Sequence, residues 1–162
     1  MAQVQHSPIG QCHSCLPMAS SALKEAVWKG QVGVVRDLLR DASADLHAAD
    51  EFARQPIHYA AIAGHIAVTG LLLGGRADIE AAGPLASRPL HCAAQFGRLA
   101  LAELLLEHRA DIEACDQHGN TPLIVARGQS RRNVVELLVC RAAERMARPA
   151  AAEATEEVGT WD

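Results

Sequence analysis

The chain has 162 residues, enough for one domain with a contiguous core but too few for two domains of ordinary size. Apolar residues make up 49% of the sequence and aromatic residues only 3%, so the core has to be built from small and aliphatic side chains, which favours closely packed helices over a sheet sandwich. With a net charge of -4, no basic face is expected, and neither nucleic acid nor an anionic membrane is expected as a partner.

The compartment is predicted from what the chain lacks. No segment approaches the roughly 20 apolar residues that span a bilayer, and the segment from Met1 to Gln11 lacks the basic-then-apolar order of a signal peptide. Five cysteines, an odd number without a dense framework, fit a reducing compartment. We therefore expect no membrane insertion and an intracellular protein, either cytoplasmic or nuclear, with the cytoplasm favoured.

The first segment, residues 1–20, is rich in serine, proline and glycine and is predicted to be a disordered tail. It contains Cys12-x-x-Cys15 with His6 and His13 nearby, which is half the spacing of a zinc site without the second pair. A solvated tail is the favoured interpretation, and no metal or cofactor is predicted. Metal or redox chemistry at the two cysteines stays open as the alternative.

A repeat of 33 residues organises most of the chain. The sequence of residues 76–81 returns unchanged at residues 109–114, and Pro56 with the two residues after it returns, less closely, at Pro89 and Pro122. An earlier unit follows the same order without the proline turn. The period divides the chain into four units, of about 21–49, 50–82, 83–115 and 116–147.

Each unit carries the signals of two short helices. A proline opens the first helix where no intrahelical amide proton is needed. Paired alanines such as Ala60 and Ala61 let helices approach closely, and Gly64 can take the left-handed conformation that ends the first helix. Leucine triplets such as residues 71–73 give the second helix an apolar stripe. One unit alone loses about 1.5 kcal/mol of ordering entropy per residue, so the units have to stack.

These units resemble the ankyrin repeat, whose pattern opens Asp-x-x-Gly-x-Thr-Pro-Leu-His, and residues 116–123 match that opening almost letter for letter. The resemblance covers roughly residues 21–147 and implies an all-α ankyrin-repeat solenoid of about four helix-turn-helix units with short β-hairpin fingers. The remaining segment, 148–162, is rich in alanine and glutamate and is predicted to be a disordered acidic tail. An incidental residue is the favoured interpretation of Trp161 in this tail, and a short linear motif is the alternative.

The units depart from the family pattern at the threonine and histidine that should bond within the turn. Gln55 and Arg88 replace the threonine in two units, and Ile124 replaces the histidine in the last unit, which keeps Thr121. No unit holds both residues, so each is expected to lack a bond worth about 1 kcal/mol.

The fingers also depart from the pattern. The turn glycine survives only as Gly119, because Ala53 and Ala86 take its place in the other two fingers, where a positive φ would cost about 1 kcal/mol. The second finger has Gly83 instead of the opening aspartate, so its geometry is the hardest to predict.

The resemblance implies that a protein partner binds the concave face, formed by the finger tips and the exposed side of each first helix. The residues at those positions are Trp28, Lys29, Glu51, Phe52, Arg54, Ile62, Leu85, Ser87, Gln95, Phe96, Gln117, His118, Asn120 and Gln129. The three aromatic residues are the strongest candidates, because aromatic and arginine side chains dominate interface hot spots. Filling gaps between fingers is the alternative for them.

The predicted function is a protein–protein interaction module of the adaptor, scaffold or inhibitor type, acting as a monomer. The alternative is a targeting module whose Cys12-x-x-Cys15 tail carries metal or redox chemistry. Catalysis is not expected, because the sequence has no glycine-rich phosphate loop, no HExxH and no GxSxG motif. His91 beside Cys92 is explained by the repeat, since neighbours along a helix point in different directions.

Overall fold

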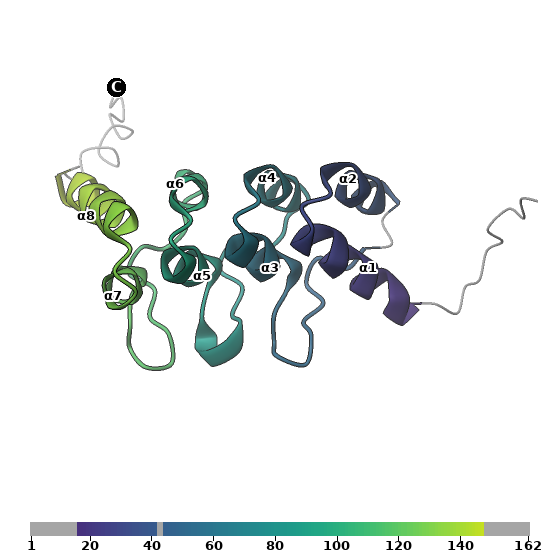
Figure 1. Ribbon diagram of the computed structural model, residues 1–162, viewed down its shortest axis with the longest axis horizontal. Helices are drawn as coiled ribbons and strands as arrows, with labels where there is room; N and C mark the ends of the chain where they lie inside the picture. The colour runs from purple at the N-terminus through teal and green to yellow at the C-terminus, as the bar shows by residue number, and fades with distance from the viewer. Residues whose placement is uncertain (1–15, 42–43, 148–162) are drawn as a thin grey trace, which may run out of the picture.

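The structure, a computed structural model, describes residues 16–41 and 44–147, and these residues form eight α-helices and one short 3-10 turn (Figure 1). The helices pair in chain order, one pair for each predicted unit. The pairs are α1 (Leu16–Trp28) with α2 (Val32–Arg40), α3 (Pro56–Ala63) with α4 (Ile66–Gly74), α5 (Pro89–Phe96) with α6 (Leu99–Glu107), and α7 (Pro122–Gly128) with α8 (Arg132–Ala147). The all-α stack of four units is confirmed.

The pairs stack side by side, so that each first helix packs against the next first helix and each second helix against the next second helix. Figure 1 shows α1, α3, α5 and α7 in one row and α2, α4, α6 and α8 in another, with the fingers projecting beyond the first row. The fingers and the first helices therefore share one long side of the stack. No helix among the described residues is long and apolar enough to cross a membrane.

The fingers are tight turns, and the prediction of β-hairpins is wrong for the described residues, which contain no strand. In each five-residue finger, the backbone amide of the first residue donates a hydrogen bond to the carbonyl of the fifth residue. The three N···O distances are 3.0 Å from Asp50 to Arg54, 2.9 Å from Gly83 to Ser87, and 3.0 Å from Asp116 to Asn120. A pair of antiparallel strands also needs the reverse hydrogen bond, from the amide of the fifth residue to the carbonyl of the first. In the first and third fingers, the side chain of the aspartate accepts that amide proton instead of its carbonyl.

The helix α1 begins at Leu16, so the predicted boundary at residue 21 lies inside this helix. The rest of the predicted first tail, 1–15, and the predicted acidic tail, 148–162, lie outside the described residues. The proline positions are as predicted, since α3, α5 and α7 each begin at a proline.

The core consists of two clusters of aliphatic side chains that meet in α3. One cluster joins the first two units and includes Leu23, Val35 and Ala60. The other joins the later units and includes Ala61 and Leu105. Neighbouring residues of α3, Ala60 and Ala61, thus face different clusters. Their small side chains let helices on both sides pack closely against α3.

Long side chains link successive units at the repeat period. His65, Arg98 and Arg131 each donate a hydrogen bond from a ring or guanidinium nitrogen to a carbonyl oxygen of the preceding first helix. The acceptors are Trp28, Ile62 and Gln95, at 3.0, 3.0 and 3.1 Å. The link also explains Gly64, whose φ is +86° and where an added Cβ would lie 2.8 Å from Cδ of Arg98.

Candidate functional site

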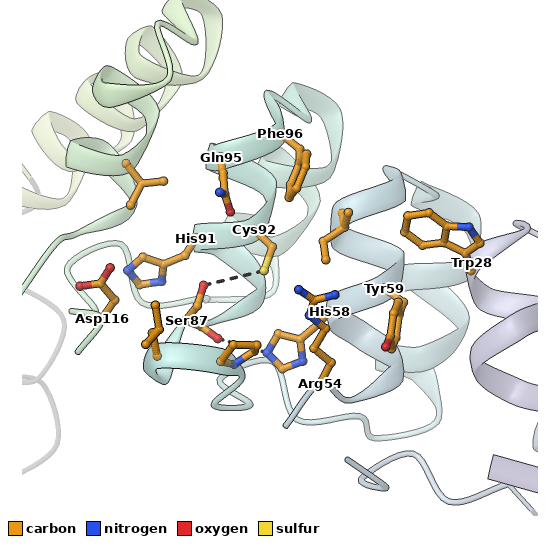
Figure 2. Close-up of a pocket in the computed structure, with 14 residues that line it drawn as sticks. Trp28, Arg54, His58, Tyr59, Ser87, His91, Cys92, Gln95, Phe96 and Asp116 are labelled. Carbon is orange, nitrogen blue, oxygen red and sulfur yellow. Dashed lines mark hydrogen bonds between the residues drawn. The ribbon is translucent and has the colours of Figure 1, made fainter. Parts of the chain in front are cut away.

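A hollow of about 790 Å³ opens where the first helices meet the fingers (Figure 2). All four units contribute to it, through the end of α1, the outer face of α3 and α5, the second finger, and single residues of the last unit. The predicted site residues that line it are Trp28, Arg54, Ile62, Leu85, Ser87, Gln95 and Phe96. The stack therefore brings these seven together, although they come from three different units.

Several apolar side chains of the hollow remain exposed to solvent. The exposed fractions are 52% for Trp28, 57% for Leu85 and 40% for Phe96. The Trp28 ring packs edge-on against Tyr59, with 6.2 Å between ring centroids and an angle of 89° between planes. This contact fixes the indole at the edge of the hollow without burying it.

The first finger is organised by Asp50. One carboxylate oxygen accepts the amide protons of Phe52 and Arg54, at 2.9 and 2.7 Å, and the other accepts the hydroxyl of Tyr59. Burial alone would raise the pKa of Asp50, but these hydrogen bonds hold it below its usual range. Burial and the Asp50 carboxylate in turn raise the pKa of Tyr59. The finger directs Phe52 to solvent, with the guanidinium of Arg54 5.7 Å from its ring centroid.

The third finger repeats this arrangement with Asp116, whose carboxylate accepts the amides of His118 and Asn120, both at 2.8 Å. It also touches the second finger, since the amide of Gln117 donates to the carbonyl of Leu85 at 2.8 Å. The two fingers are therefore joined through their backbones.

A family model of ankyrin repeats, with three copies, matches residues 23–116 and again residues 57–148. The chain belongs to the ankyrin-repeat family. Ankyrin repeats generally serve as protein interaction modules and are typically not catalytic. No curated protein matches the sequence.

The other predicted residues of this ankyrin face lie outside the hollow. They are Lys29, Glu51, Phe52, Gln117, His118, Asn120 and Gln129. Lys29 forms an exposed ion pair with Glu25 at 2.6 Å, and the side-chain amide of Asn120 donates to Asp116 at 3.1 Å. Those two side chains have structural partners, whereas Phe52, Gln117 and His118 are exposed on the fingers.

Sequence reasoning missed part of the hollow, including Tyr59, Cys92 and Val125. These three residues occupy one place in the 33-residue period, and Tyr59 lies one helical turn before the predicted Ile62. Residues three or four positions apart share a helix face. Extending the predicted face by one turn would have found them.

Two buried histidines tie the ankyrin helices to the following finger. Nδ1 of His58 accepts the amide proton of Gln55 at 3.1 Å, so Nε2 carries the proton and donates to the carbonyls of Ala81 and Ser87, at 3.1 and 3.2 Å. His91 accepts the amide of Arg88 and donates to Asn120 in the same way, at 3.3 and 3.0 Å. Burial lowers the pKa of both histidines, which keeps the rings neutral.

The hydrogen bond that the family's threonine would make is missing in the second unit, where Oε1 of Gln55 is buried without a hydrogen-bond partner. In the fourth unit Thr121 accepts the amide of Ile124 at a long 3.4 Å. The links made by His58 and His91 are complete without the threonine.

The lining of the hollow holds no activated nucleophile. Burial raises the pKa of the Cys92 thiol, and its nearest polar partner is the Ser87 hydroxyl at 3.8 Å. Both ring nitrogens of His91 are engaged by backbone groups. Within the part of the chain that the structure describes, no three His, Cys, Asp or Glu side chains are grouped so that they could hold a metal ion.

Proposed function

We propose that this chain is a protein–protein interaction module that binds its partner on the concave ankyrin face. The observation that carries the proposal is the hollow, where apolar side chains from different units stay exposed around one opening. Covering one large apolar side chain completely contributes about 1.5–3 kcal/mol. Trp28, Leu85 and Phe96 together offer enough apolar surface to anchor a partner.

The charges of this face are largely satisfied within the chain. Glu80 pairs with Arg88, and the carboxylates of Asp50 and Asp116 hold their own finger amides. Arg54 lines the hollow, whose lining contains no lysine and no other arginine. The partner that fits best inserts an uncharged apolar side chain and offers an acceptor to Arg54.

The wider function follows from this mode of binding. We propose a monomeric adaptor, scaffold or inhibitor without catalytic activity, located in the cell and preferentially in the cytoplasm, with no nucleic acid or membrane as partner. The alternative at Cys12 and Cys15 lies outside the described residues, and we do not propose it.

The test compares two matched variants in capture of partners from the native cell lysate. Leu85→Ala with Phe96→Ala removes apolar surface from the hollow, and Val34→Ala with Ile66→Ala removes similarly exposed surface on second helices. Circular dichroism first establishes equal helicity. We expect a protein captured by the wild type to be lost only with the first variant, with at least about tenfold weaker binding after purification. Equal capture by both variants would refute the concave face as the binding surface.

A further inference from the structure

The end of the stack formed by α7 and α8 exposes positions that are covered in the earlier units. His58 and His91 are 0% and 2% exposed, whereas Ile124, at the same place in the repeat, is 49% exposed. On α8, Val139 is 45% exposed, and Val135 is half-buried where the matching Ala102 is fully buried. Ile124, Val135 and Val139, the apolar side chains at these positions of the last unit, are together named the terminal face.

The terminal face is flanked by arginine. A shallow hollow of about 360 Å³ lies beside Val135, and its other lining residues are Arg127, Arg132, Ser130 and Glu136. Arg127 stands where the two preceding units have fully buried alanines, Ala61 and Ala94. Among the described residues, neither arginine takes part in an ion pair.

The charge of this region opposes that of the whole chain. Residues 127–148 contain six arginines and two glutamates, a net charge of plus four, in a chain whose total is -4. The ion pairs that this region makes, Arg141 with Glu144 at 3.1 Å and Arg145 with Asp111 at 3.8 Å, are exposed and therefore weak. A positive surface beside apolar side chains fits an acidic segment that carries a large apolar side chain.

The chain itself supplies such a segment directly after α8. Residues 149–162 contain four acidic and no basic residues, a net charge of minus four, together with Val158 and Trp161. Fourteen extended residues reach about 45 Å, while the 16 residues of α8 span about 24 Å. The segment is therefore long enough to turn back along the whole terminal face.

We propose that the acidic segment 149–162 binds the terminal face and closes the stack in place of a fifth unit. Its carboxylates pair with Arg127 and Arg132, and Trp161 covers Ile124, Val135 and Val139. The same contact protects an apolar surface that would otherwise be open to a second copy of the chain.

The test uses Trp161 as a fluorescent probe in the full chain. The sequence has two tryptophans, so Trp28→Phe leaves Trp161 alone. We expect its quenching by acrylamide to be several-fold weaker in the folded chain than in urea. Arg127→Glu with Arg132→Glu removes this protection, and the charge swap is completed by Glu156→Arg with Glu157→Arg, which restores it. The control, Arg36→Glu with Arg40→Glu, changes two exposed arginines on α2 and leaves the protection intact.

Three results would overturn the proposal. The first is quenching in the folded chain as strong as in urea, which would mean that the segment is not bound. The second is protection that disappears on dilution together with a dimer mass in sedimentation, which would assign the face to a second copy. The third is protection that survives Arg127→Glu with Arg132→Glu but is lost in Leu85→Glu, which would place Trp161 in the concave hollow.

Discussion

The second finger closes with the same backbone hydrogen bond as the first and third fingers, but without the carboxylate that organises them. Asp50 and Asp116 each accept two finger amides, whereas Gly83 offers no side chain. In the second finger Leu85 and Ala86 both adopt a positive φ, of 56° and 55°. The comparison teaches that the closing backbone bond is common to all three turns, while the side chains decide which residues the turn presents.

The space around the histidines explains the missing aspartate. Nε2 of His58 would lie 2.7 Å from a Cβ added to Gly83, and the carbonyl of Ser87 would lie 3.0 Å from it. In the third finger, Asp116 occupies the place of Gly83, and His91 donates to the carbonyl of Asn120, which matches Ser87 in the repeat. The second finger thus sits directly on its histidine and turns Leu85 toward the hollow.

The strongest test of this difference between the fingers is Gly83→Asp, which gives the second finger the aspartate found at this place in the first and third fingers. We expect a loss of about 3 kcal/mol in the free energy of unfolding, since the new Cβ overpacks the site and displaces His58 from its carbonyls. Urea unfolding measures the change. Gly70→Ala is the control, because an added Cβ there meets no atom within 4 Å. A neutral or stabilising Gly83→Asp would show that the finger can move away from the histidine.

Removing the carboxylate from the first finger should have the next largest effect. Asp50→Ala leaves the amides of Phe52 and Arg54 and the hydroxyl of Tyr59 without their acceptor, and we expect a loss of about 2 kcal/mol, moderated because solvent reaches the turn. The neighbouring Glu51→Ala is the control in the same urea measurement. The carboxylate has no organising role if the two variants are equally stable.

Acid should weaken the links to the second and third fingers. Burial lowers the pKa of His58 and His91 below the ordinary value of 6.5, so the unfolded chain binds protons that the folded chain excludes. This stability is complete above pH 6.5 and is lost as the pH falls below it, by up to about 1.4 kcal/mol per pH unit for a histidine that stays neutral. The urea midpoint, followed from neutral to mildly acidic pH, measures the slope. His58→Asn should flatten it, while the exposed His118→Gln should not; a slope unchanged in both would contradict the assignment.

The smallest effects concern the turn position itself. Ala53 and Ala86 have φ of 59° and 55°, and Gly119 occupies the matching place at 76°. Ala53→Gly and Ala86→Gly should each stabilise the chain by about 1 kcal/mol, and Gly119→Ala should destabilise it by a similar amount. Thermal unfolding of the three variants would reveal whether one finger departs from this rule.

The sequence predicted the features that local stereochemistry controls. The helices begin at Pro56, Pro89 and Pro122, and Gly64 and Gly97 end theirs in the left-handed conformation, because each of these residue types restricts or frees its own backbone. The exact repeat of residues 76–81 at residues 109–114 also has a structural counterpart, since Arg76 and Arg109 both adopt a positive φ, of 68° and 66°.

The sequence did not predict the contacts made between units. His58 reaches the carbonyl of Ser87 across 29 positions of the chain, and Tyr59 packs against Trp28 of the preceding unit. The period shows which residues are equivalent, but not which residue of the next unit each one meets. The predicted hairpins failed for a related reason, because Asp50 and Asp116 capture the amides that a strand ladder would use.

Because the two core clusters meet in α3, the two halves of the stack can unfold locally and independently of each other. Since Ala60 and Ala61 face different clusters, each half can open briefly while the other stays packed. Amide hydrogen exchange would then show two rates, one for each half. The hollow runs from Trp28 to Val125 and therefore crosses both halves. A partner bound along it would slow exchange in the two halves together and make them open as one.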